Sequence, residues 1–109
     1  MDLTDLTFFY CKGLPAEERY NLIDQINRCS VSIPSNIAEG SGKTTNKHFA
    51  DFLSTSISSS YELETQLLIC ERRNYRVDTE LQQCIELVKE VQKMIFSFRE
   101  YILNGNAPS

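Results

Sequence analysis

Apolar residues recur along much of this chain at alternating steps of three and four positions, the spacing that puts side chains on one face of an α-helix. No segment alternates between apolar and polar residues at every second position, so strands are not expected. The clearest stripe comprises Leu81, Cys84, Val88, Val91, Ile95, Phe98 and Ile102. Another comprises Phe49, Leu53, Ser56, Ser60, Leu63, Leu67 and Cys70. The second stripe passes unbroken through the serine-rich segment 54–60, which we therefore interpret as helix and not as a linker.

Glycine, proline and polar capping residues divide this pattern into four expected helices, at about 2–12, 16–41, 45–73 and 78–104. Pro15 suits the first turn of the second helix, and Asp78 is typical of the residue that caps the fourth. The third begins after a cap from Thr44, Thr45 or Asn46. The connections are short, which favours antiparallel neighbours. The sequence therefore predicts an all-α, antiparallel up-and-down four-helix bundle that forms a single domain over residues 1–109.

The first expected helix is short, and its apolar positions are Leu3, Leu6, Phe9 and Tyr10. A helix of this length does not persist alone in water, so it must be held by contacts with the other helices.

Pro34 falls inside the second expected helix. Its ring removes one backbone donor, which leaves the carbonyl of Ser30 without a helical partner. Helices continue through such a proline with a bend, so we expect a kink at Pro34 and a helix end at Gly40 or Gly42. Asn36 carries both donors and acceptors and is a candidate partner for the groups at the kink.

The fourth expected helix carries further apolar residues off its main stripe: Leu87, Met94, Phe96, Tyr101 and Leu103. Two explanations are open. A second apolar surface on one helix suggests that copies of the chain associate. Alternatively, one wide stripe faces two neighbouring helices of the same chain.

Residues Gly42, Lys43 and Thr44 match the second half of a phosphate-binding loop, G-x-x-x-x-G-K-[ST]. The first glycine of that motif would stand at position 37, where the chain has Ile37, and a helical pattern precedes it where a strand is required. The motif therefore does not indicate a nucleotide-hydrolysing enzyme.

The chain of 109 residues has 15 acidic and 11 basic residues, a net charge of −4, which speaks against general affinity for nucleic acids. Cys11, Cys29, Cys70 and Cys84 are widely spaced, and the one histidine is His48. We interpret the cysteines as small apolar residues of helix faces and expect neither a metal site nor a cofactor. No apolar run is long enough to span a bilayer and the start lacks a secretory pattern, so we expect a cytoplasmic protein.

Basic residues gather in two small groups at predicted helix ends: Lys43 and Lys47, then Arg72, Arg73 and Arg76. In an antiparallel bundle these groups lie at opposite ends. If copies of the chain form a ring, each group is multiplied into a ring of positive charge that contacts RNA or DNA. The alternative is that they are ordinary solvated charges at helix ends.

Two phrases, SIPSNIAEG at 32–40 and YELETQLLIC at 61–70, resemble the 23S rRNA-intervening-sequence protein family. This resemblance implies a bacterial four-helix bundle that assembles into a homopentamer and has no known catalytic activity. A similar fold occurs in the accessory variability protein of diversity-generating retroelements, a basic pentamer that binds nucleic acid. The present chain departs from the pattern in its short first helix and in its acidic charge.

The residues shared with the family suggest either a binding surface or a structural network at an interface, and we favour the structural interpretation. They are Pro34, Asn36, Glu39, Gly40, Glu62 and Glu64. On a helix Glu62 and Glu64 lie about 200° apart, which argues against a paired-carboxylate catalytic site. The sequence thus favours a non-enzymatic oligomeric scaffold, with a nucleic-acid-binding accessory protein as the alternative.

Overall fold

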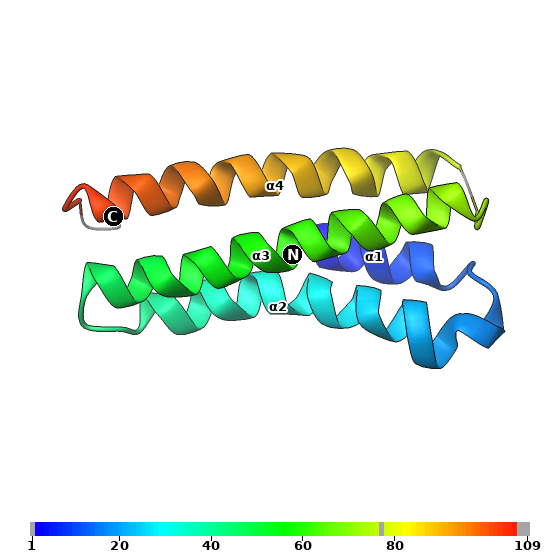
Figure 1. The fold of residues 1–109 in the computed structure, drawn as a ribbon, viewed down its shortest axis with the longest axis horizontal. Coiled ribbons are helices and arrows are strands. Elements are labelled where there is room, and N and C mark those ends of the chain that lie inside the picture. Colours follow the sequence, from blue (N-terminus) through cyan, green and yellow to red (C-terminus); the bar gives the residue numbers. More distant parts are fainter. Residues whose placement is uncertain (1, 77, 107–109) are drawn as a thin grey trace.

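The computed structural model describes residues 2–76 and 78–106, and the elements in this part of the chain are all helical. The four α-helices run alternately up and down (Figure 1) in a bundle that measures 45 × 23 × 19 Å. They are α1 (Asp2–Cys11), α2 (Asp24–Ser41), α3 (Asn46–Arg72) and α4 (Thr79–Leu103). The predicted all-α four-helix bundle with a short first helix is therefore confirmed.

The entry into the second helix differs from the expected single helix over 16–41. A 3₁₀ turn, η1 (Ala16–Glu18), and a π turn, η2 (Arg19–Ile23), precede α2. Glu18 is only 8% exposed, and its carboxylate accepts a hydrogen bond from the Tyr75 hydroxyl at 3.3 Å. A π turn inserts one extra residue into the helical turn and so changes which side chains face inward. Here Leu22 becomes buried and Ile23 half-buried.

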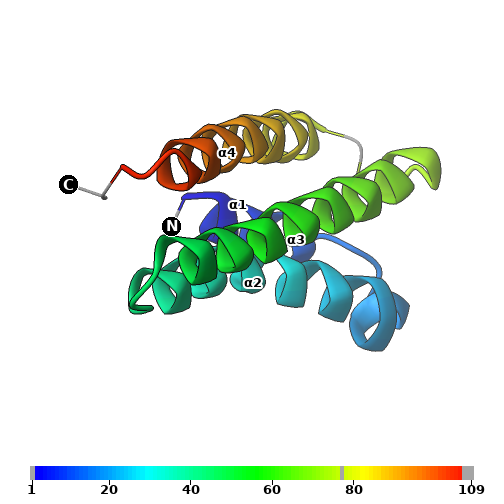
Figure 2. The same ribbon diagram turned by 60° about the vertical axis from the view of Figure 1, so that its left-hand side comes forward.

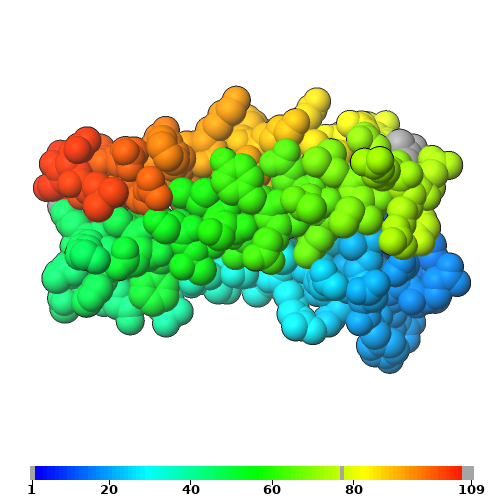
Figure 3. Space-filling view, in the orientation of Figure 1, coloured from blue at the N-terminus to red at the C-terminus, as the bar shows by residue number. Residues whose placement is uncertain are grey.

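The predicted stripes form the core. Every residue of the α3 stripe is buried, including Ser56 and Ser60 of the serine-rich segment, which is helical as expected. In α4 the stripe is buried except for Val91 and Phe98, which are half-buried. The space-filling view shows α3 lying between α4 and α2 along the whole length of one face (Figure 3).

Helix α1 lies between α2 and α4, on the other side of the bundle from the exposed face of α3 (Figure 2). Its buried residues are Leu3, Thr7, Tyr10 and Cys11. The assignment of Phe9 to the apolar face was wrong, because its side chain is 53% exposed. The 10 residues of α1 extend about 15 Å and the 25 residues of α4 about 37 Å, so α1 lies beside less than half of α4.

Helix α2 continues through Pro34 to Ser41, with Gly42 as the C-terminal cap. A bend at Pro34 stays a prediction. The N-terminal caps of α3 and α4 are Thr45 and Asp78, whose side chains accept hydrogen bonds from the backbone N–H groups of His48 and Leu81. Both caps satisfy N–H groups that have no partner within their own helix.

Candidate functional site

The carbonyl that Pro34 leaves without a helical partner accepts a hydrogen bond from another helix. The hydroxyl of Thr4 in α1 donates to the Ser30 carbonyl at 3.1 Å. From the other neighbouring helix, the hydroxyl of Ser56 in α3 donates to the Ile33 carbonyl at 2.6 Å. The backbone next to Pro34 is thus tied to both neighbouring helices, and these bonds fix their axial positions.

Asn36 bonds to Ser32 and not to the Ser30 carbonyl. Its Nδ2 donates to the Ser32 carbonyl at 2.8 Å and to the Ser32 hydroxyl at 3.0 Å. The Ser32 hydroxyl lies 2.8 Å from that of Ser59 in α3. These side chains form a short polar chain between α2 and α3, in which each member has a partner.

The two glutamates of the second shared phrase contact different helices. Glu62 accepts a hydrogen bond from the Cys29 thiol of α2 at 3.4 Å. Glu64 accepts one from Nε2 of Gln92 in α4 at 2.8 Å. Within the described residues, no hydrogen bond or ion pair joins either of them to Asn36 or Glu39. The structure therefore does not bring the two shared phrases together into one group of carboxylates.

Gly40 has a packing role, whereas its neighbour Glu39 is exposed. A Cβ added at Gly40 would lie 2.6 Å from Cβ of Phe52 and 2.9 Å from Cδ1 of Phe49. Only a glycine therefore permits α2 to approach α3 this closely at the end of the helix pair.

Four of the five basic residues of interest are exposed, at opposite ends of the bundle (Figure 1). Lys43 lies over the Phe52 ring, 5.1 Å from its centre, and Lys47 lies 3.5 Å from the carboxylate of Asp51. Arg72 and Arg73 are at the other end, at the close of α3. Arg73 lies 3.9 Å from the carboxylate of Glu18, so one cation of each group is paired with an acidic side chain.

Arg76 differs from Arg72 and Arg73, because its guanidinium is used inside the fold. Its Nη1 donates to the carbonyls of Phe9 and Tyr10 at 3.2 and 2.6 Å. It also pairs with Asp78 at 2.9 Å and with Glu80 at 2.6 Å. A nucleic-acid contact through Arg76 would require these bonds to break. The spacing to Glu80 suggests an i, i+4 pair, but nothing in the sequence indicated the bonds to α1.

The thiols are poorly suited to nucleophilic chemistry. Burial raises the pKa of Cys11 to about 12 and that of Cys84 to about 11. Burial, followed by the hydrogen bond to Glu62, raises the pKa of Cys29 to about 11. At neutral pH these groups are therefore protonated, and the thiolate is the reactive form. All four cysteines are free and buried, as expected for residues that fill helix faces.

Residues 2–76 and 78–106 contain no group of three or more His, Cys, Asp or Glu side chains arranged to hold a metal ion. In the same part of the chain, no helix combines the length and the apolar character needed to cross a bilayer.

Comparison with known proteins gives one family. The model of the family described as 23S rRNA-intervening sequence protein matches residues 1–97 of the chain. No curated protein matches the sequence. The match includes both shared phrases and all six of the residues discussed for them.

Proposed function

The chain belongs to the 23S rRNA-intervening sequence protein family, and from this premise we propose that it is a non-enzymatic cytoplasmic protein that assembles with copies of itself into a scaffold. A homopentamer is the assembly that the family resemblance implies. The observation that carries this proposal is the exposure of four large apolar side chains at the carboxyl end of α4, which lie on two flanks of the helix, Met94 and Tyr101 on one and Phe96 and Leu103 on the other.

Residues 94–103 of α4 hold four large apolar side chains that are exposed to solvent. They are Met94 (69% exposed), Phe96 (52%), Tyr101 (47%) and Leu103 (52%). Helix α1 lies beside the other half of α4, so it does not cover them (Figures 1 and 2). The sequence left open whether these residues face neighbours in the same chain, and their exposure favours a contact with another chain. Because each of these side chains is already partly covered, burying the rest gains roughly half of the 1.5–3 kcal/mol that burial of a fully exposed large apolar side chain contributes.

The mass of the protein in solution tests this proposal. We expect size-exclusion chromatography with light scattering to give an oligomer for the wild type and a smaller species for Met94→Glu and Tyr101→Glu, because each introduces a charge into the apolar flank that these two residues share. Gln83→Glu adds the same charge at an exposed position near the start of α4 and should leave the mass unchanged. A wild-type protein that is monomeric at every concentration would refute the proposal.

Nucleic-acid binding is the second candidate, supported by the exposure of Lys43, Lys47, Arg72 and Arg73. The net charge of −4 argues against it. Binding of fluorescent RNA and duplex DNA, measured at two salt concentrations, decides between the two. A contact through these residues weakens steeply as salt rises. Absence of binding even at low salt removes this candidate and leaves self-assembly untouched.

A further inference from the structure

The exposed side of α4 carries four strips of different character. With a turn of about 100° per residue, they follow one another around the helix in the order apolar, acidic, basic and apolar. Their members are Met94 and Tyr101, then Glu86 and Glu90, then Lys89 and Lys93, and finally Phe96 and Leu103. All eight residues are exposed. The strips form two sides of α4: the Met94 side, which includes the acidic strip, and the Phe96 side, which includes the basic strip.

The four charged side chains of these strips have no partner in their own chain. Residues three positions apart on a helix, such as Glu86 and Lys89, are close enough to pair. Within residues 2–76 and 78–106, however, none of the four forms an ion pair or a side-chain hydrogen bond. Both strips therefore present charges that are available to another molecule.

A second copy of the chain complements both sides at once, if the two α4 helices lie parallel and the Met94 side of one faces the Phe96 side of the other. Four pairs then face each other, each shifted by two or three positions: Glu86 with Lys89, Glu90 with Lys93, Met94 with Phe96, and Tyr101 with Leu103. A shift of two or three residues is about 3–4.5 Å along a helix axis. One register therefore aligns two pairs of opposite charge and two apolar pairs.

An antiparallel arrangement of the same two sides does not give this match. It places Met94 opposite Leu103, and the glutamates then face residues beyond the end of α4 instead of the lysines. The order of the strips around the helix also requires the parallel arrangement. In that arrangement the apolar pairs lie on one side of the contact and the charged pairs on the other.

The shape of the Phe96 side also suits this contact. Phe96, Ile57 and Tyr61 line a groove of about 440 Å³ between α3 and α4, and Lys93 lines it as well. On the opposite flank Met94 is 69% exposed. A thioether makes favourable contacts with aromatic rings. The groove of one copy can therefore receive Met94 of the next.

We propose that copies of the chain join head to tail, with the Met94 side of one α4 packed in parallel against the Phe96 side of the next. This inference rests on the proposed self-assembly and names the surfaces that carry it. The centres of the two sides lie about 110° apart around α4, close to the interior angle of a ring of five copies. A head-to-tail contact can close into such a ring, whereas contact of one side with itself stops at a dimer.

Exchange of the charges tests the contact by light scattering at several protein concentrations. Glu86→Lys with Glu90→Lys makes both strips basic, and Lys89→Glu with Lys93→Glu makes both strips acidic. We expect each double variant to raise the concentration needed for assembly at least about tenfold, because like charges then face each other. All four substitutions together exchange the two strips, so assembly should return.

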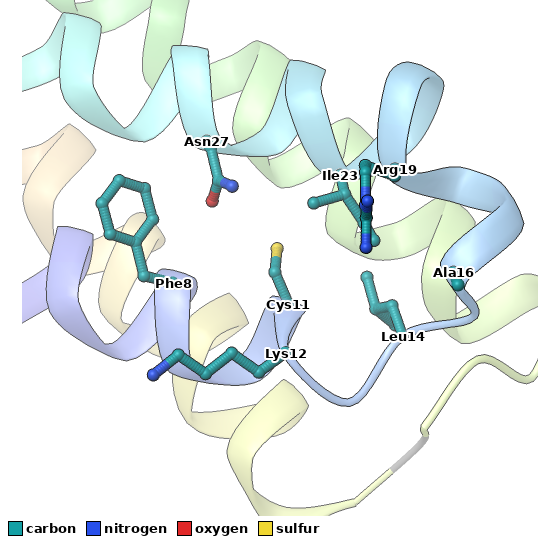
Figure 4. Close-up of a pocket in the computed structure, with 8 residues that line it drawn as sticks. All are labelled: Phe8, Cys11, Lys12, Leu14, Ala16, Arg19, Ile23 and Asn27. Atoms are coloured by element: carbon teal, nitrogen blue, oxygen red, sulfur yellow. The ribbon is translucent and has the colours of Figure 1, made fainter.

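The control for the lysines of α4 lies at the pocket between α1 and the start of the second helix (Figure 4). Figure 4 shows Lys12 and Arg19 on opposite sides of this pocket, so they do not form a strip along one helix. Lys12→Glu with Arg19→Glu changes the net charge by the same amount as the double lysine variant. It should assemble as the wild type does.

Cross-linking tests the register of the two helices. Chains with Glu90→Cys are mixed with chains with Lys93→Cys, at a concentration where both assemble, and treated with a short bis-maleimide. We expect a product that joins the two kinds of chain, and none from either kind alone. The native thiols are buried, so the wild type supplies the background. Lys43→Cys in place of Lys93→Cys should give no product.

The results that overturn this contact differ from the one that refutes self-assembly. An oligomeric wild type contradicts the head-to-tail contact if the double variants keep its mass, or if the fourfold variant does not regain it. Cross-linking of Glu90→Cys chains to one another also contradicts it, because that result indicates contact of one side with itself. A monomeric wild type refutes self-assembly and this contact together. Circular dichroism of each variant separates loss of assembly from loss of helix.

Discussion

Replacing Arg76 with alanine removes the side chain that caps the carboxyl end of α1. At the carboxyl end of α1 the carbonyls of Phe9 and Tyr10 accept backbone hydrogen bonds from Lys12 and Gly13 at 3.2 and 3.1 Å, and each accepts a further bond from the Arg76 guanidinium. The same guanidinium lies 5.5 and 5.3 Å from the centres of the Phe9 and Tyr10 rings. Because α1 has only 10 residues, its docking depends heavily on such contacts.

The size of the expected loss in stability follows from how exposed Arg76 and its partners are. The Arg76 side chain is 22% exposed and Tyr10 is fully buried, so the bond to the Tyr10 carbonyl is partly shielded from water, whereas the bond to the Phe9 carbonyl is exposed. A hydrogen bond from a charged donor contributes about 1.5–3 kcal/mol. The Asp78 and Glu80 side chains are 36% and 34% exposed, so solvent screens their pairs, and we count only the bond to the Tyr10 carbonyl. We expect Arg76→Ala to lower the free energy of unfolding by about 2–3 kcal/mol.

Urea denaturation followed by circular dichroism measures this loss. With a slope of about 2 kcal/mol/M, the midpoint should fall by about 1–1.5 M. Arg76 has a φ of 47°, and alanine keeps the Cβ, so the backbone strain is the same in both proteins. Arg72→Ala, which removes an exposed arginine nearby, should change stability by less than about 0.5 kcal/mol. An Arg76→Ala loss no larger than this control would refute the reasoning.

Gly13 gives a second test of the same contact. A Cβ added at Gly13 would lie 2.6 Å from Cδ of Arg76 and 2.7 Å from its Nη1. Gly13→Ala should therefore displace the guanidinium and destabilise the wild type, yet cost much less when Arg76 is already alanine. Strictly additive effects of the two substitutions would contradict a role for Arg76 in capping α1.

Three further predictions concern the helix contacts. Thr4→Val should lower the free energy of unfolding, measured by urea denaturation, by about 1 kcal/mol, because it removes the hydrogen bond to the Ser30 carbonyl. In a Pro34→Ala background the same substitution should lower it by less, because alanine supplies an N–H group for that carbonyl. An equal loss in both backgrounds would contradict this. Gly40→Ala should cost about 1–3 kcal/mol in thermal unfolding through overpacking, whereas a Cβ at Gly42 meets only a carbonyl oxygen at 3.6 Å and should be tolerated. Desolvation raises the pKa of Asp78, but hydrogen bonds from the first turn of α4 and from the neighbouring arginine outweigh it and hold that pKa below its usual value. The stability that this charge contributes is therefore present above pH about 4 and is lost as pH falls, so the difference between wild type and Asp78→Asn should shrink in acid and not stay constant.

Local spacing determined the helices and their inward faces. The steps of three and four placed Ser56 and Ser60 on the buried side of α3, although their composition suggested a linker. The cap Asp78 was also readable, and Thr45 was one of three candidates, because a cap acts on backbone groups within the next turn. Spacing likewise showed that Glu62 and Glu64 face apart. These features depend on residues close in sequence, and the chain alone specifies them.

Tertiary structure decided which helix supplies each partner. The Ser30 carbonyl bonds to Thr4 and not to Asn36. Arg76 bonds to the carboxyl end of α1, which lies far from it in the sequence. A π turn next to buried Glu18 replaces regular helix before α2. Each outcome joins groups from different elements, so it depends on how the helices are shifted and rotated against one another. That arrangement comes from packing of the whole core, which the 3.6-residue period of a single helix does not encode.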